Sequence, residues 1–163
     1  MSISEEVLMG IAAVSVTLVG FSGVVTALGR KRSESWSQSE SIQLFALVAP
    51  SIVTLISAFV PIGLQLLTEN SDIIWRVSNG VCFLGHLFGV SYFMRIGSNL
   101  PVRFSHKIGL TFTFSIMAIL LMSSLGFGSW YQFTFLLGLL LGIGVSVHNF
   151  YLLLSPAITG NSD

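Results

Sequence analysis

Five apolar stretches, separated by short polar joints, dominate the pattern of the chain. They run over residues 7–28, 42–67, 73–94, 108–125 and 131–154. Each is long enough, or nearly so, to cross a hydrocarbon layer about 30 Å thick as a helix. The stretches are unbroken and rich in Leu, which disfavours membrane strands because those alternate apolar and polar positions. The pattern predicts an all-α, polytopic integral membrane bundle with five transmembrane helices, in one membrane domain covering residues 1–163.

The joint at residues 126–130 decides between five spans and four. It holds two glycines and a serine within five residues, a composition that disfavours continuous helix. Trp130 and Tyr131 suit the aromatic belt at a membrane surface. We therefore predict a tight turn here, with a four-span fold as the alternative.

The charged residues predict how the helices are oriented. Glu5 and Glu6 precede the first apolar stretch and basic residues follow it. A signal peptide has the opposite order, so this stretch is expected to remain as a helix. The first and third joints carry six of the seven cations, which are Arg30, Lys31, Arg32, Arg95, Arg103 and Lys107. Alternate joints lie on the same side, so the positive-inside rule predicts an external N-terminus and a cytoplasmic C-terminus in a multi-pass plasma membrane protein.

Composition excludes several classes of function. The chain is 53% hydrophobic and 9% charged, whereas soluble domains are about 25% charged. Seven basic and seven acidic residues balance, so we expect no nucleic-acid partner. The single cysteine, Cys82, excludes an internal disulfide and a Cys-rich metal site. The seventh cation, Arg76, lies near Glu69 and Asp72 and is expected to reach outward to one of these carboxylates, with a gate or an anion contact as the alternative.

A polar stripe follows the second stretch. At about 100° per residue, six residues fall on one side of the helix. They are Gln43, Pro50, Thr54, Ser57, Pro61 and Gln65. Prolines free backbone carbonyls, which protein or water must satisfy in a membrane, so this face is expected to point inward. Two interpretations are open. In the first, this face lines a hydrated path or forms a movable kink. In the second, the prolines only bend the helix, while Ser and Thr donate hydrogen bonds to its backbone.

The third stretch contains His86 close to the membrane midplane. Asn79, Cys82 and Gly89 lie within the same arc of the helix. An ionisable residue at this depth is a candidate functional residue, since its charged form is costly to bury. The alternatives are a neutral imidazole that joins two helices, proton passage or pH sensing, and haem b ligation together with His148 on the fifth stretch.

Small residues predict where helices pack closely. On the first stretch they are Gly10, Ala13, Thr17 and Gly20, and on the fifth they are Gly138 and Gly142. A second small-residue side of the first stretch, at Ser15, Ser22 and Thr26, implies two neighbours for this helix, in this chain or in another copy.

The functional hypothesis is a small, non-enzymatic, homo-oligomeric membrane protein that forms a gated polar path for ions, protons or small solutes, or a sensing element. Its proposed lining is the stripe of the second stretch together with Asn79 and His86. The first alternative is a membrane anchor, assembly or immunity-type subunit that packs on the helices of a partner. The second is a haem-bearing anchor with His86 and His148 as ligands. Outside that second alternative we expect no cofactor and no metal.

Overall fold

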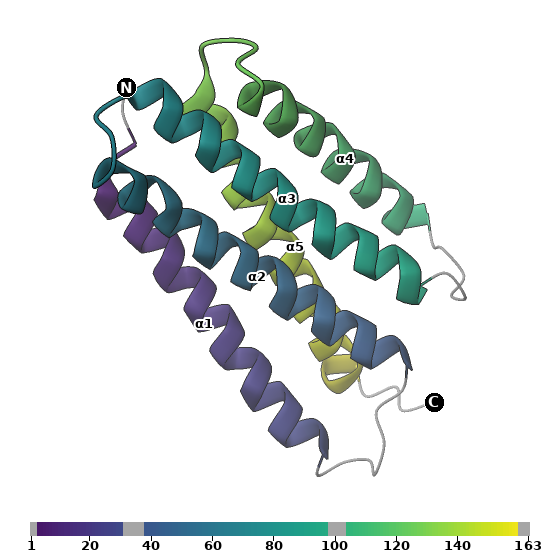
Figure 1. Cartoon of the computed structure of the whole chain (residues 1–163). Coiled ribbons are helices and arrows are strands. Elements are labelled where there is room, and N and C mark those ends of the chain that lie inside the picture. Colours follow the sequence, from purple (N-terminus) through teal and green to yellow (C-terminus); the bar gives the residue numbers. More distant parts are fainter. Residues whose placement is uncertain (1–2, 31–37, 98–103, 160–163) are drawn as a thin grey trace.

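The computed structural model describes residues 3–30, 38–97 and 104–159, and all the regular structure in them is helical. The helices are α1 (Glu5–Arg30), α2 (Gln38–Gln65), α3 (Ser71–Gly97), α4 (Phe104–Ser124) and α5 (Tyr131–Thr159). They occupy the five predicted stretches, and the predicted turn at residues 126–130 separates α4 from α5 (Figure 1). The second helix ends at Gln65 instead of 67, and Leu66 and Leu67 are 86% and 82% exposed in the joint that follows.

Among the described residues, four helices, α1, α2, α3 and α5, are long and apolar enough to cross a membrane. In α4 the part whose side chains are described, Gly109–Ser124, is also apolar and extends about 24 Å at 1.5 Å per residue. These lengths and this composition are those of a helical membrane protein.

Successive helices run in opposite directions (Figure 1). The α2–α3 and α4–α5 joints therefore lie at the same end as the start of α1, which we call the acidic end for its residues Glu5, Glu6, Glu69 and Asp72. Arg30 and Arg95, near the ends of α1 and α3, belong to the opposite end. Lys31, Arg32 and Arg103 lie outside the described residues.

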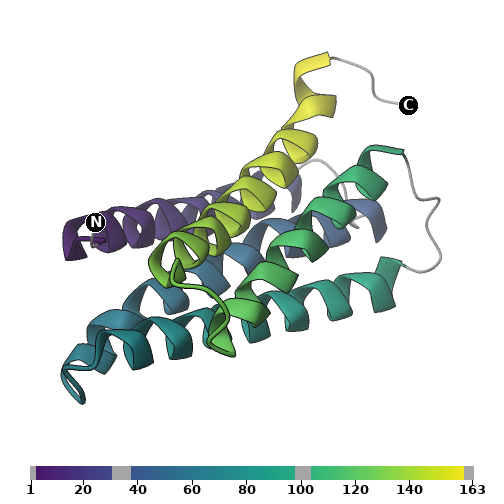
Figure 2. The same ribbon diagram turned by 90° about the horizontal axis from the view of Figure 1, so that it is seen from above.

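The bundle is a row of four helices crossed by the fifth. α1, α2, α3 and α4 lie side by side in chain order, and α5 packs across one face of this row (Figures 1 and 2). Within the described residues α5 contacts all four other helices, whereas α1 contacts α2 and α5 alone. Side chains from three or more helices therefore meet along α5, and α1 is peripheral.

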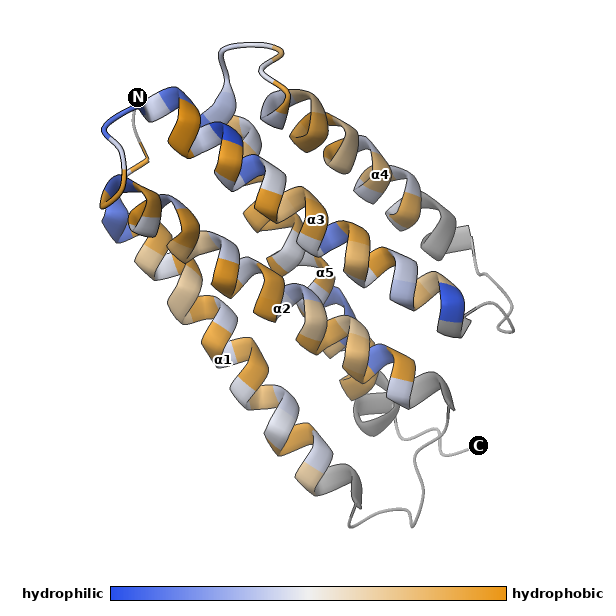
Figure 3. Ribbon diagram, viewed as in Figure 1, coloured by the Kyte–Doolittle hydropathy of each residue, from blue (hydrophilic) through white to orange (hydrophobic). Residues whose placement is uncertain are grey.

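Large apolar side chains are exposed on all five helices. Apolar positions follow most of the length of each helix, and hydrophilic residues occur near both ends of α3 (Figure 3). Phe88 on α3 and Phe112 on α4 are 72% and 61% exposed. In a bilayer these faces meet lipid tails, which are as apolar as the side chains themselves. The apolar core lies instead against α5, where Trp75 packs on Phe135 with ring centroids 5.7 Å apart.

At the acidic end, α1 and α3 both begin with a capping side chain. The hydroxyl of Ser4 accepts from the amide of Val7 at 3.4 Å. Asn70 Oδ1 accepts from the amides of Asp72 and Ile73 at 3.1 and 3.2 Å. Such caps satisfy the free amides of a first helical turn, and the acids in both first turns suit the helix dipole.

The end of α4 is closed by a glycine with positive φ. Gly126 has φ of 95°, a backbone conformation that favours glycine. The amide of Gly126 donates to the Ser123 carbonyl at 3.1 Å, and the amide of Phe127 donates to the Met122 carbonyl at 3.0 Å. This pair of bonds is a Schellman motif, and it satisfies two of the last carbonyls of the helix.

Arg76 satisfies the next two carbonyls. Its Nε donates to the Ser124 carbonyl at 3.3 Å and its Nη2 donates to the Leu125 carbonyl at 3.2 Å. The guanidinium thus reaches across from α3 to the end of α4, in place of the predicted contact with Glu69 or Asp72. The negative end of the α4 dipole favours a cation at this position, which explains the preference for the carbonyls.

Candidate functional site

The polar stripe of α2 turns inward along its middle section. Thr54, Ser57 and Pro61 are fully buried, and Pro50 is half-buried. Both prolines lie inside the continuous helix α2. Gln43 is also half-buried, and Gln65 is exposed. The structure therefore buries three of the six candidate residues, covers Pro50 and Gln43 in part and leaves Gln65 outside the bundle.

The polar face of α3 meets this part of α2. Asn79 and Cys82 are fully buried and His86 is 6% exposed. The side chain of Ser57 on α2 lies next to the thiol of Cys82. The candidate residues of α2 and α3 thus lie on facing surfaces within one chain.

Three glycines bring α2, α3 and α5 together around His86. A Cβ at Gly142 of α5 would collide with Thr54 Oγ1 and lie 3.1 Å from the Pro50 carbonyl oxygen. A Cβ at Gly138 would lie 2.9 Å from the Cys82 sulfur, and one at Gly85 would lie 2.6 Å from a methyl of Val53. We call this meeting of three helices the glycine junction.

His86 is held by the backbone of α5. Its Nε2 is hydrogen-bonded to the Gly138 carbonyl oxygen at 2.9 Å. A carbonyl can only accept, so Nε2 carries the proton and Nδ1 is the acceptor in the neutral ring. Its Cε1, the atom between the two nitrogens, would lie 3.3 Å from a Cβ at Gly142, the same point that Thr54 Oγ1 approaches. The ring and the hydroxyl thus share one small volume of the junction.

Thr54 differs from the other buried polar side chains in this region. Its Oγ1 is the one buried side-chain nitrogen or oxygen atom, among the residues the structure describes, that has no hydrogen-bond partner. A buried hydroxyl without a partner costs about 1–3 kcal/mol. A buried, unpaired hydroxyl beside an ionisable ring is the feature of this bundle that packing leaves unexplained.

A second polar group lies nearer the acidic end. Asn79 Nδ2 donates to the carbonyls of Trp75 at 2.7 Å and Tyr131 at 2.8 Å. Thr134 Oγ1 donates to Asn79 Oδ1 at 3.0 Å and lies 2.8 Å from the hydroxyl of Ser123. Asn79 therefore joins α3 to α5 with nearly all of its hydrogen-bonding capacity in use.

Ser51 and Ser146 form a third group that the sequence reasoning missed. Both are fully buried, and their hydroxyl oxygens are 2.8 Å apart. Ser51 also donates to the Leu47 carbonyl at 3.0 Å, so Ser146 donates to Ser51. The signal in the sequence is the spacing of four from Thr134 through Gly138 and Gly142 to Ser146, which places one stripe along α5.

These groups together form a line of polar residues between α2, α3 and α5, all of them buried except the half-buried Thr134, which we call the polar seam. Its members are Ser51, Thr54, Ser57, Asn79, Cys82, His86, Thr134 and Ser146. From Thr134 to Ser146 the seam follows α5 for about 18 Å. That distance is more than half of a hydrocarbon layer about 30 Å thick.

The other predicted residues lie away from the seam. His148 on α5 is exposed. His86 contacts α5 at Gly138 and near Gly142, and both glycines precede His148 by at least one and a half helical turns. His86 Nε2 is also engaged by a carbonyl. The described geometry therefore does not favour haem ligation by this pair.

The predicted small-residue face of α1 turns away from the bundle. Its four residues, Gly10, Ala13, Thr17 and Gly20, are all exposed, and a Cβ at either glycine would meet nothing within 4 Å. The contacts of α1 inside the chain come from the other side of the helix, where Ser15 and Ser22 are buried. The predicted packing face thus meets none of the helices in the part of the chain that the structure describes.

Comparison with known proteins gives no family to draw on. No protein-family model, no curated protein and no solved structure matches the chain. The functional argument therefore depends on the seam itself.

Proposed function

We propose that this protein provides a gated polar path for protons or small polar solutes along the polar seam, and that the described conformation is its closed state. In this proposal the protein is not an enzyme and lies in the plasma membrane, with the end that carries Arg30 and Arg95 in the cytoplasm. It carries one path in each subunit of a homo-oligomer. The path lies inside each protomer because the polar faces of α2 and α3 meet there, against α5.

The observation that carries the proposal is the unpaired Thr54 hydroxyl beside His86. Packing alone accounts for a buried hydroxyl when it is paired, because a paired hydroxyl costs little in a membrane interior. Thr54 gains a partner if water or a proton carrier enters the glycine junction. His86 is the ionisable group at that point, and its Nδ1 is the acceptor that such a carrier would meet.

A small separation of α2 from α5 would open the path. The two helices touch through Gly142, which has no side chain to interlock with Thr54. Pro50 and Pro61 each remove a backbone hydrogen bond from α2, so bending at these positions breaks fewer bonds than elsewhere in the helix. Movement of the middle of α2 would expose Thr54, Ser57 and His86 to the same water.

The test is proton flux into liposomes that hold the purified protein and a pH-sensitive dye. Thr54→Ala and Thr54→Ser both lose the methyl group and differ in the hydroxyl. We expect Thr54→Ser to keep the flux and Thr54→Ala to lower it about tenfold, which corresponds to about 1.4 kcal/mol in the barrier. His86→Ala and Ser57→Leu should also reduce it, whereas Thr17→Val on the exposed face of α1 should not.

Flux equal to that of empty liposomes at every pH and voltage would refute the proposal, as would flux that is unchanged in both His86→Ala and Ser57→Leu.

Cys82 supplies an independent readout because it is fully buried in the seam. A small thiol reagent should label it slowly in the closed state and faster under conditions that increase flux. Labelling that does not follow flux would place the path elsewhere.

A second candidate function is that of a subunit that packs against the helices of another membrane protein. The exposed small-residue face of α1 favours it, because Gly10 and Gly20 leave room for a close helix and meet none among the described residues. Purification in mild detergent separates the two candidates. A stable partner of different sequence, together with no flux, would favour the subunit.

A further inference from the structure

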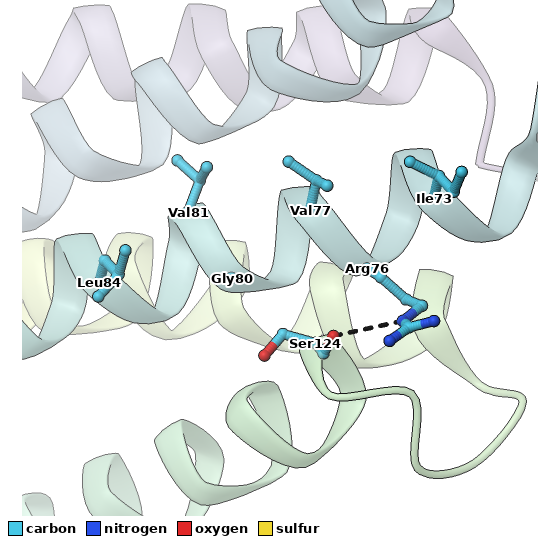
Figure 4. Close-up of a pocket in the computed structure, with 7 residues that line it drawn as sticks. All are labelled: Ile73, Arg76, Val77, Gly80, Val81, Leu84 and Ser124. Atoms are coloured by element: carbon cyan, nitrogen blue, oxygen red, sulfur yellow. Dashed lines mark hydrogen bonds between the residues drawn. The ribbon is translucent and has the colours of Figure 1, made fainter. Parts of the chain in front are cut away.

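A groove between α3 and α4 opens on the surface of the bundle near the acidic end. Its volume is about 420 Å³. It is lined by Ile73, Arg76, Val77, Gly80, Val81, Leu84 and Ser124. Figure 4 shows the apolar side chains in a row along α3, with Arg76 reaching to Ser124 on the α4 side. The groove is therefore apolar along its length and has one cation at its outer end.

The groove has the length of one leaflet. Ile73 and Leu84 are eleven residues apart on α3, which corresponds to about 16 Å along the helix. Half of a hydrocarbon layer measures about 15 Å. Gly80 lacks a side chain at the middle of the groove, where an added Cβ would lie 3.6 Å from Ser124 Cβ. An acyl chain fits such a channel better than a compact ligand does.

The outer end of the groove carries the charges of a zwitterionic headgroup. Arg76 uses two of its five N–H donors on the carbonyls of α4, which leaves three for another acceptor. It is the one cation that the described residues place at this end. Asp72 precedes Arg76 by one helical turn and Glu69 lies just before α3, and both are exposed. A phosphate would pair with Arg76, and an ammonium would pair with the carboxylates.

We propose that this groove binds a phospholipid with a primary amine, of the phosphatidylethanolamine type. One acyl chain lies along Ile73, Val77 and Leu84, the phosphate accepts from the guanidinium of Arg76, and the ammonium faces Asp72 and Glu69. A purely anionic headgroup is disfavoured because two carboxylates flank a single cation. This proposal is independent of the polar seam, since none of the groove-lining residues belongs to it.

The headgroup preference of the wild-type protein is the first test. Protein purified in mild detergent is offered equal amounts of phosphatidylethanolamine, phosphatidylcholine and phosphatidylglycerol with the same acyl chains, and retained lipid is counted by native mass spectrometry. We expect phosphatidylethanolamine to be retained at least several times more than either of the others. Equal retention of the three, preference for phosphatidylglycerol or phosphatidylcholine, or no retained lipid would overturn the proposal.

Variants locate the site. Val77→Trp fills the groove from a position that is 43% exposed, and Val16→Trp makes the same change on the lipid-facing side of α1, which is 54% exposed. We expect Val77→Trp to lower the retention of phosphatidylethanolamine about tenfold, or about 1.4 kcal/mol, and Val16→Trp to leave it unchanged. Equal retention in the two variants would place the lipid elsewhere and overturn the proposal. If Val77→Trp does not fold, Val81→Phe replaces it with the same expected and opposing outcomes.

Discussion

Replacement of Gly142 by alanine tests the glycine junction directly. The new methyl group would collide with Thr54 Oγ1 and lie 3.1 Å from the Pro50 carbonyl oxygen and 3.3 Å from His86 Cε1. The carbonyl belongs to backbone, so it cannot rotate away as a side chain can. Overpacking of this kind costs about 1–3 kcal/mol, against about 1 kcal/mol that alanine gains over glycine inside a helix. We therefore expect Gly142→Ala to lower the free energy of unfolding by up to about 2 kcal/mol.

Gly144 is the matched control on the same helix. It is exposed, and a Cβ there would meet nothing within 4 Å. Gly144→Ala should leave the free energy of unfolding unchanged or raise it by up to about 1 kcal/mol. Unfolding in mixed micelles of a mild detergent and sodium dodecyl sulfate, followed by circular dichroism, measures both variants.

A double-mutant cycle shows whether the cost arises at Thr54. Thr54→Ala removes the atom with the worst contact, so the double variant should be more stable than the sum of the two single changes by about 1 kcal/mol or more. Equal stabilities of Gly142→Ala and Gly144→Ala would refute the close approach of α5 to α2. Additive effects in the cycle would show that Thr54 does not contact Gly142.

Two further predictions concern the hydrogen bonds that join α3 to α4 and α5. Arg76→Gln removes the two bonds to the end of α4 and should lower the free energy of unfolding by about 1–2 kcal/mol. Hydrogen exchange at the amides of Gly126 and Phe127 should become faster, and Arg76→Lys should restore part of the lost stability. Unchanged exchange at those amides would contradict the cap. Asn79→Leu removes one hydrogen bond within α3 and two that join α3 to α5, and it should lower the free energy of unfolding by about 2 kcal/mol, at about 0.6 kcal/mol for each membrane hydrogen bond. Asn149→Leu should cost less, because among the described residues the Asn149 side chain bonds to the Val145 carbonyl of its own helix alone. Equal unfolding energies for these two variants would contradict the role of Asn79.

The helices could be predicted from the sequence because membrane insertion depends on uninterrupted apolar length, which one chain displays directly. The turn after α4 was also predictable, since Gly126 and Gly128 both adopt positive φ and glycine marks such positions. The partner of Arg76 was not. Its choice between the carboxylates of its own helix end and the carbonyls of α4 depends on how α3 and α4 are placed, and no pattern within either helix contains that information.

The candidate site was predictable in part for the same reason. A helical wheel assigns Thr54, Ser57 and His86 to faces, and those faces are buried in the structure. It does not identify the neighbour that covers them. The covering helix is α5, and its glycines were predicted only as packing positions. The pairing of Ser51 with Ser146 required the register between α2 and α5, which no single sequence displays.

The hydrogen-bond partners of the buried and exposed hydroxyl groups distinguish a packing role from a functional role better than composition does. Serine and threonine in membrane helices commonly donate to the carbonyl four residues earlier, and this is the ordinary explanation for a polar stripe. Ser15, Thr17, Ser51, Ser78 and Thr113 all follow it, with oxygen–oxygen distances of 2.7–3.0 Å. Thr54 does not, although Pro50 precedes it by four residues in the same helix. The ordinary explanation thus accounts for these five hydroxyls and fails at Thr54, the hydroxyl beside His86. If Thr54 served packing alone, Thr54→Ala and Thr54→Ser would not differ in flux. The comparison of these two variants therefore tests the function of the seam.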